Sequence, residues 1–79
     1  LSYFISMTVL DLTAGEVAEI VKVGASGAAA ERLFSLGFTR GRQVSVLGWS
    51  LFKSSVLLQC GSVRLAARRT IAQKIEVKK

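Results

Sequence analysis

The segment spanning residues 36–44, LGFTRGRQV, constrains the fold of this chain more than any other. It contains two glycines, Gly37 and Gly41. Gly37 can adopt the left-handed conformation that ends a helix, because glycine has no Cβ to clash there. Phe38 then stands where an apolar residue folds back onto the last helical turn, against Leu33. The segment therefore predicts a helix that ends at Gly37, a tight turn and then the start of a strand.

Short apolar segments separated by turn residues fill the rest of the chain. The alternation and β-branched content predict strands over residues 17–23, 42–49, 55–60, 63–66 and 74–77. In the later strands, Val44, Val46 and Gly48 share one face, Val56, Leu58 and Cys60 share one face, and Ile75 and Val77 point inward. A helix is expected over residues 28–36, with Ser26 as its N-cap and a buried stripe made of Ala29, Leu33 and Leu36. Residues 50–54 form a loop, and residues 67–72 a connection with about one helical turn.

The number and spacing of these elements predict a mainly β fold. Gly61 and Ser62 form a two-residue turn with glycine first, which suits a type II′ hairpin. Five short strands, one short helix and tight turns favour a small, curled antiparallel barrel, because closure removes exposed strand edges. An SH3-like barrel fits best, and a partly open OB-like barrel is the alternative.

The length and composition describe one small domain. The chain has 79 residues, of which 51% are hydrophobic, so it can bury a core. A core of this size leaves only about 3–5 kcal/mol of net stability, so a partner or self-association could add to it. We assign residues 8–79 to the domain and residues 1–7 to an N-terminal extension or cloning scar.

The content of chemically active residues points away from an enzyme and from a metal centre. The chain has no histidine, one cysteine and five scattered acidic residues. A serine or cysteine nucleophile needs a positioned base, and ferrous iron takes nitrogen and carboxylate ligands. We therefore expect no catalytic site, no cofactor and no dedicated metal site, with Cys60 as a buried structural residue. The segment from Gly24 to Gly27 is too short for a phosphate-binding loop and lacks its lysine.

The charge is basic, and it leaves nucleic-acid binding as the main rival interpretation. The net charge is +6, from 11 basic and 5 acidic residues. Small barrels bind RNA or DNA through basic residues interleaved with aromatic ones, and Trp49, Phe52 and Lys53 share one loop. However, the basic residues are dispersed along the chain, and Phe34 and Phe38 are expected in the core. Ordinary solvated surface is the simpler interpretation of the charge.

The sequence contains no targeting or membrane-spanning segment. No apolar run approaches the roughly 18–20 residues that a membrane-spanning helix needs. Residues 1–10 have neither a basic start nor a small-residue cleavage site, so they do not form a secretory signal. A lone cysteine and the lack of an export signal favour a cytoplasmic location, without direct membrane insertion.

Three motifs resemble the ferrous iron transport protein A (FeoA) family over nearly the whole chain. Residues 32–44 match the pattern Arg-Leu-x-x-Leu-Gly-Phe-x-x-Gly-x-x-Val at every position. The opening pattern Leu-x-x-Leu-x-x-Gly corresponds to Val9, Leu12 and Gly15. Residues 61–77 resemble the family's closing segment, with Ala67 where leucine is usual and Ile71 where glutamate is frequent.

This resemblance implies a function as well as a fold. The resemblance implies a cytosolic accessory module of bacterial ferrous iron uptake that docks on the transporter FeoB and modulates it. It therefore implies FeoB as the partner. A related domain occurs at the C-terminus of metal-dependent repressors, which leaves open a metal-responsive domain that would use carboxylates and Cys60. Nucleic-acid binding also remains an alternative.

The loop after the second predicted strand is the candidate binding site. Trp49, Leu51 and Phe52 are large apolar residues at a strand end and in a loop, and Trp and Phe dominate binding hot spots. They either fold back over the barrel mouth or stand exposed as an anchor for a partner. In the second interpretation they form one apolar patch with the helix end, and the partner-binding residues are Trp49, Leu51, Phe52, Lys53, Arg40 and Arg42.

Overall fold

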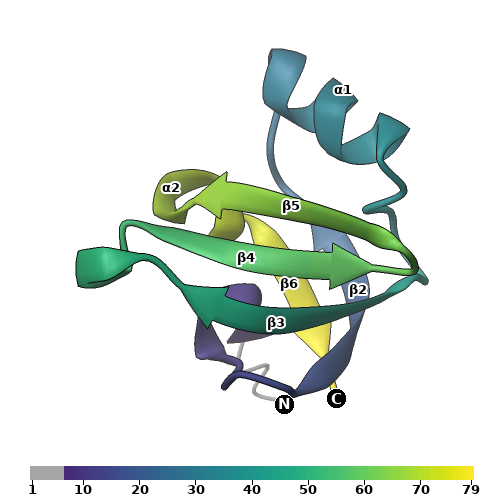
Figure 1. Cartoon of the computed structure of the whole chain (residues 1–79). Coiled ribbons are helices and arrows are strands. Elements are labelled where there is room, and N and C mark those ends of the chain that lie inside the picture. Colours follow the sequence, from purple (N-terminus) through teal and green to yellow (C-terminus); the bar gives the residue numbers. More distant parts are fainter. Residues whose placement is uncertain (1–6) are drawn as a thin grey trace, which may run out of the picture.

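The computed structural model of the chain describes residues 7–79, which form one curled antiparallel sheet with a short helix over it (Figure 1). The sheet has six strands in the order β1-β6-β2-β3-β4-β5. The strands are β1 (Met7–Thr8), β2 (Val17–Val23), β3 (Gln43–Trp49), β4 (Ser55–Cys60), β5 (Val63–Arg68) and β6 (Ile75–Lys78). The helical elements are η1 (Val9–Asp11), α1 (Gly27–Ser35), η2 (Leu51–Lys53) and α2 (Arg69–Ala72).

This architecture confirms the predicted mainly β fold with one short helix. The additional strand is β1, in which Met7 pairs with Val77 and Thr8 with Glu76. Two residues are too few to show an alternating pattern, so β1 could not be predicted from periodicity. Met7, which the sequence assigns to the N-terminal extension, is therefore part of the sheet. The rest of that extension, residues 1–6, lies outside the described residues.

The core follows the predicted faces of β4 and β6, and that of β3 as far as Val46, whereas the alternation predicts no buried face for β2. The residues expected to point inward on β3, β4 and β6 are fully or almost fully buried: Val44, Val46, Val56, Leu58, Cys60, Ile75 and Val77. In β2 the buried residues are Ala18 and Ile20, whereas Val17 is half exposed. Each face of this strand carries one charged residue, Glu19 or Lys22, so the alternation alone could not choose between the faces.

The end of α1 has the predicted geometry. Gly37 has φ +93°, and its N–H donates to the Phe34 carbonyl at 3.1 Å. The Phe38 N–H donates to the Leu33 carbonyl at 2.9 Å, which completes the two-bond C-terminal motif of a helix. Phe38 and Leu33 are both buried, so the cap also joins the helix to the core. Ser26 is the N-cap as expected, although its hydroxyl makes no capping bond.

A bulge in β3 changes the orientation of its last residues. Val46 lies opposite Leu58, but Gly48 lies opposite Leu57 and Trp49 opposite Val56, so the register shifts by one residue. Because Val56 is buried, the shift turns Trp49 toward the core side, and Trp49 packs against the core cluster. Gly48, expected on the face of Val44 and Val46, therefore sits on the outer face.

The two edge strands of the sheet are β1 and β5. The short helix α2, predicted as one helical turn, contacts β4, β5 and η1, so it bridges the two edges of the curled sheet. The Gly61–Ser62 turn joins β4 to β5 with Cys60 opposite Val63, and Gly61 has φ +63°, as a type II′ turn requires. No helix within residues 7–79 is long and apolar enough to cross a membrane.

Candidate functional site

The loop between β3 and β4 exposes two large apolar side chains. Leu51 is 83% exposed and Phe52 is 95% exposed. Trp49 differs from both, because it is partly buried against the core. Trp49 therefore folds back onto the core, as in the first predicted arrangement. Leu51 and Phe52 are exposed to solvent, as in the second.

Hydrogen bonds between serines hold the base of this loop. The Ser50 N–H donates to the Ser55 carbonyl at 3.0 Å, and the Ser55 N–H donates to the Ser50 hydroxyl at 2.9 Å. The Ser50 and Ser54 hydroxyls are 3.1 Å apart and share a hydrogen bond. The Lys53 N–H donates to the Ser50 carbonyl at 2.9 Å. The loop is therefore held by its own short-range contacts and by one bond from α2, in which the Arg69 N–H donates to the Ser54 carbonyl at 3.0 Å.

The backbone of η2 is strained at two residues. Phe52 has φ +62° and Lys53 has φ +54°, and among the described residues these are the two non-glycine positions in the left-handed region. Such a conformation costs on the order of 1–2 kcal/mol per residue, because Cβ approaches the following carbonyl oxygen. The Lys53 ammonium lies 5.9 Å from the centroid of the Trp49 ring, within the range of a cation–π contact. This contact orients Lys53 over the base of the loop.

The apolar surface continues from η2 onto the outer face of the sheet. A shallow hollow of about 330 Å³ is lined by Gly48, Trp49, Ser50, Ser55, Leu57 and Ala66. Leu57 is 37% exposed within it. We call Trp49, Leu51, Phe52, Lys53 and Leu57 the η2 surface. Leu57 was not among the predicted binding residues, although its position between the buried residues Val56 and Leu58 indicates an apolar side chain on the outward face.

Arg40 and Arg42 do not belong to this surface, so the expectation of a single patch is wrong. Arg42 precedes β3, and its guanidinium lies beside Gly37 and Gly61, at the turn between β4 and β5. The η2 loop follows the other end of β3 (Figure 1). A strand of this length separates its ends by about 20 Å, at roughly 3.3 Å per residue. The helix end and the loop therefore lie at opposite ends of the sheet.

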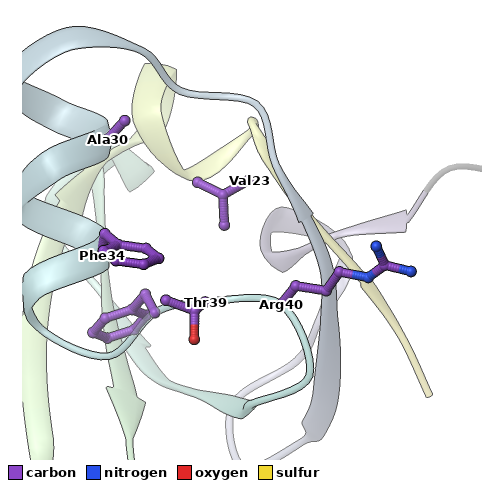
Figure 2. A pocket seen from close by; sticks show the side chains of 6 residues that line it. Val23, Ala30, Phe34, Thr39 and Arg40 are labelled. Carbon is purple, nitrogen blue, oxygen red and sulfur yellow. The ribbon is translucent and has the colours of Figure 1, made fainter.

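Arg40 instead borders a second hollow, next to α1. This hollow has a volume of about 250 Å³ and is lined by Val23, Ala30, Phe34, Phe38, Thr39 and Arg40. Figure 2 shows the Phe34 ring directed toward Val23, while the Arg40 guanidinium points away from the hollow. Phe34 is 73% exposed, so its expected place in the core is wrong. It follows Leu33, the buried residue of α1, and therefore lies about 100° farther round the helix.

The ionisable groups of residues 7–79 include no cluster of three or more His, Cys, Asp or Glu residues that could hold a metal ion. Cys60 is buried as expected, and its Sγ donates to the Gly37 carbonyl at 3.3 Å. The pKa of Glu16 is lowered to about 2, first by its hydrogen bond from Lys79 and then by the Thr13 N–H. This pair joins the turn before β2 to the chain end, away from η2.

Comparisons with known proteins agree on one family. The family model for the FeoA domain matches residues 7–79. The solution structure of the FeoA protein from Chlorobium tepidum is 33% identical, with a TM-score of 0.85 over 91% of this chain and 69% of that one. The crystal structure of Stenotrophomonas maltophilia FeoA complexed with zinc is 30% identical, with a TM-score of 0.80 over 91% of this chain and 89% of that one.

The same fold recurs in a second class of protein. A manganese-dependent transcriptional repressor is 15% identical, with a TM-score of 0.83 over 100% of this chain and 44% of the repressor. At this identity the likeness concerns the fold alone. The Stenotrophomonas protein is described as a prokaryotic SH3 domain protein and a candidate activating factor of ferrous iron transport. No curated protein matches the chain.

Proposed function

The chain belongs to the FeoA family, and from this premise we propose that it is an accessory protein of ferrous iron transport that docks on a partner through its η2 surface. The family supports the setting in iron transport, and the geometry of η2 supports the site. The function is binding rather than catalysis. The partner that the family resemblance implies is the cytosolic region of the transporter FeoB.

The observation that carries the proposal is the exposure of Leu51 and Phe52 on a strained loop. A loop with no role beyond connection would relax or use glycine at a left-handed position, because strain of this kind raises the free energy of the folded state. Strained residues persist where they present a side chain for function. Phe52 is an aromatic side chain of the kind that anchors protein interfaces, and it is almost fully accessible.

The η2 surface also indicates the chemistry of the partner. Leu51 and Phe52, beside the hollow at Leu57, would fill an apolar recess of the partner. Lys53 would meet an acidic group at the rim of that recess. Few residues contribute, so we expect an interface at the small end of the usual size range and a transient complex. Because Arg40 and Arg42 lie at the other end of the sheet, they take no part in it.

Calorimetric titration of the purified chain with the cytosolic domain of FeoB from the same organism tests the proposal. The Leu51→Ser/Phe52→Ser variant should bind at least about tenfold more weakly, a loss of about 1.4 kcal/mol. The unfolding temperature of this variant should not fall, because neither side chain is buried. Trp49 is left intact, since it packs against the core and its loss would disturb the fold.

The matched control is Phe34→Ser, which removes an exposed phenylalanine from α1. It should bind like the wild type, because it lies outside the η2 surface. Unchanged binding by the η2 variant would overturn the site. Capture of a random RNA pool in place of the transporter domain, lost at moderate salt, would favour the nucleic-acid alternative.

A further inference from the structure

Strand β5 has an unpaired edge whose backbone groups are available for pairing. Within residues 7–79 it ends the strand order and pairs with β4 alone. Cys60 and Val63 close a two-residue turn, so they form a hydrogen-bonded pair, and bonded and non-bonded pairs alternate from there. Leu65 and Ala67 therefore bond to β4. The N–H groups of Arg64, Ala66 and Arg68, and the carbonyls of Arg64 and Ala66, point away from the sheet.

An apolar groove runs between this edge and helix α1. It has a volume of about 210 Å³ and is lined by Ala29, Arg32, Leu33, Leu65, Ala66, Ala67, Arg68 and Ile71. Figure 1 shows α1 on the side of the sheet where β5 lies. The volume is below the roughly 300–1,000 Å³ typical of small-molecule sites. The groove therefore suits one or two apolar side chains better than a cofactor.

The two charged residues that line this groove are both positive. Arg32 and Arg68 belong to the groove lining, and both are exposed. Arg64 lies on the outer face of β5, on the same side as Arg68. No acidic residue lines the groove, and none of these arginines forms an ion pair with a carboxylate in the described part of the chain. The edge therefore favours a ligand with negative charge at alternate positions.

We propose that β5 binds an extended segment of a partner protein, in which acidic and apolar residues alternate, as an added strand. The backbone of the segment would pair with the outward groups of Arg64, Ala66 and Arg68. Side chains of a strand alternate between two faces, so the apolar ones enter the groove beneath α1 and the acidic ones lie beside Arg64 and Arg68. This surface adjoins the hollow of the η2 surface at Ala66, but it uses none of the five residues of the η2 surface and does not depend on the proposed function.

The competing explanation is that the arginines only protect the edge. Charged residues on edge strands discourage pairing with other chains, and this alone would account for Arg64 and Arg68. Protection does not require an apolar groove next to the edge, nor a third arginine on α1. The two explanations differ in one measurable respect, which is whether an acidic extended peptide binds.

Fluorescence anisotropy of a short labelled peptide of alternating glutamate and valine tests the proposal on the full chain. We expect saturable binding, and no binding of the matching lysine–valine peptide. The Ala66→Pro variant should bind at least about tenfold more weakly, because it removes an outward N–H donor and obstructs the added strand. This position faces away from β4, so the proline leaves the β4–β5 bonds in place. An intact far-ultraviolet circular dichroism spectrum checks the fold.

Charge variants provide a second test. Arg64→Glu/Arg68→Glu should weaken peptide binding, whereas Lys53→Glu/Lys78→Glu, with the same change in net charge, should not. Leu51→Ser/Phe52→Ser should also bind the peptide normally, which separates this surface from the η2 surface. Slowed amide exchange at Ala66 and Arg68 with bound peptide would place the ligand on the edge.

Three results would overturn the proposal. The first is the absence of binding by the acidic peptide, which would leave edge protection as the role of the arginines. The second is equal binding by the wild type and a folded Ala66→Pro variant. The third is equal binding of the lysine–valine peptide, or capture of oligouridine in place of either peptide, because the arginines would then not select an acidic strand.

Discussion

The turn after α1 and the η2 loop both contain a residue in the left-handed conformation, but one turn buries an aromatic side chain and the other exposes one. In the first, the left-handed residue is Gly37, with φ +93°, and the next side chain, Phe38, is 1% exposed. In the second, the left-handed residue is Phe52 itself, with φ +62° and 95% exposure. The first turn has no Cβ at the critical position and buries an aromatic ring. The second has a Cβ there and buries nothing.

The two turns therefore contribute to stability with opposite signs. At Gly37 the left-handed conformation is unstrained, and it directs Phe38 into the core. Burial of a phenylalanine there stabilises the folded state by several kcal/mol. At Phe52 and Lys53 the same region of φ costs on the order of 1–2 kcal/mol per residue, with no burial to offset it. A small domain retains such a loop at the expense of its stability, which suggests selection for what the loop presents.

The largest effect should come from the buried ring of the first turn. Phe38→Ala should lower the free energy of unfolding by about 3–5 kcal/mol, because it removes a fully buried aromatic side chain and leaves a cavity. Phe34→Ala is the matched control, and it should change stability by no more than about 0.5 kcal/mol, because that ring is mostly exposed. Because a domain of this size has only about 3–5 kcal/mol of net stability, Phe38→Ala should be largely unfolded even without urea, which circular dichroism detects, and urea unfolding measures the loss in Phe34→Ala. Equal losses in the two variants would contradict the assigned burial.

A smaller effect should come from the glycine itself. Gly37→Ala should destabilise the chain by about 1–2 kcal/mol, the cost of the left-handed conformation for a residue with a Cβ. The new Cβ would lie 3.5 Å from the Arg42 guanidinium, an ordinary contact, so the cost is conformational rather than steric. Gly48→Ala is the control, since Gly48 has no positive φ and open space around it. A loss at Gly48 as large as that at Gly37 would contradict this argument.

At η2 the same kind of change should have the reverse sign. Phe52→Gly should raise the free energy of unfolding by about 0.5–1 kcal/mol, because relief of the left-handed strain exceeds the backbone entropy that glycine loses. The same variant should lose affinity for the partner, so stability and binding should change in opposite directions. Leu51→Gly, which relieves no such strain, should not stabilise the chain. Thermal unfolding measures both variants, and a destabilised Phe52→Gly would show that the loop is not strained.

The difference between the two turns also explains what the sequence could predict. The helix end is specified locally, since Gly37, Phe38 and Leu33 lie within a few residues of one another. The glycine takes the left-handed position of the helix end, and the apolar residue after it packs on the last turn. The strand faces of β3, β4 and β6 follow from simple alternation. The structure confirms these features, and the match of the FeoA family model confirms the predicted family.

The errors arose where a distant or single-residue feature decides the geometry. The bulge near Leu47 comes from the pairing of β3 with β4, and no local pattern shows it, so the orientation of Gly48 was wrong. The grouping of Arg40 with Phe52 failed because closeness in sequence does not give distance across a strand. The left-handed conformation of Phe52 was not predictable, since phenylalanine rarely adopts it. The candidate loop could therefore be located from its composition, while its shape could not.

The smallest expected effect concerns pH, and it arises outside both turns, at the pair formed by Glu16 and Lys79. The pKa of Glu16 falls from its ordinary value near 4.5 to about 2, because Lys79 and the Thr13 N–H bind the charged form. The folded state thus holds this proton less tightly than the unfolded state. The resulting stabilisation is complete above about pH 4.5 and is lost as the pH falls through about 2. It should be small, because both side chains are partly exposed.

Comparison of Glu16→Gln with the wild type over a pH series measures this contribution. The difference in unfolding temperature should be constant at pH 5 and above and should shrink as the pH falls from about 4.5 toward 2. The gain from Phe52→Gly should be the same at both ends of this series, because strain at a phenylalanine involves no proton. A Glu16→Gln difference that persists unchanged at pH 2 would show that the carboxylate is not held by Lys79. A Phe52→Gly gain that vanished on acidification would show that electrostatics, rather than backbone geometry, sets the energy of the η2 loop.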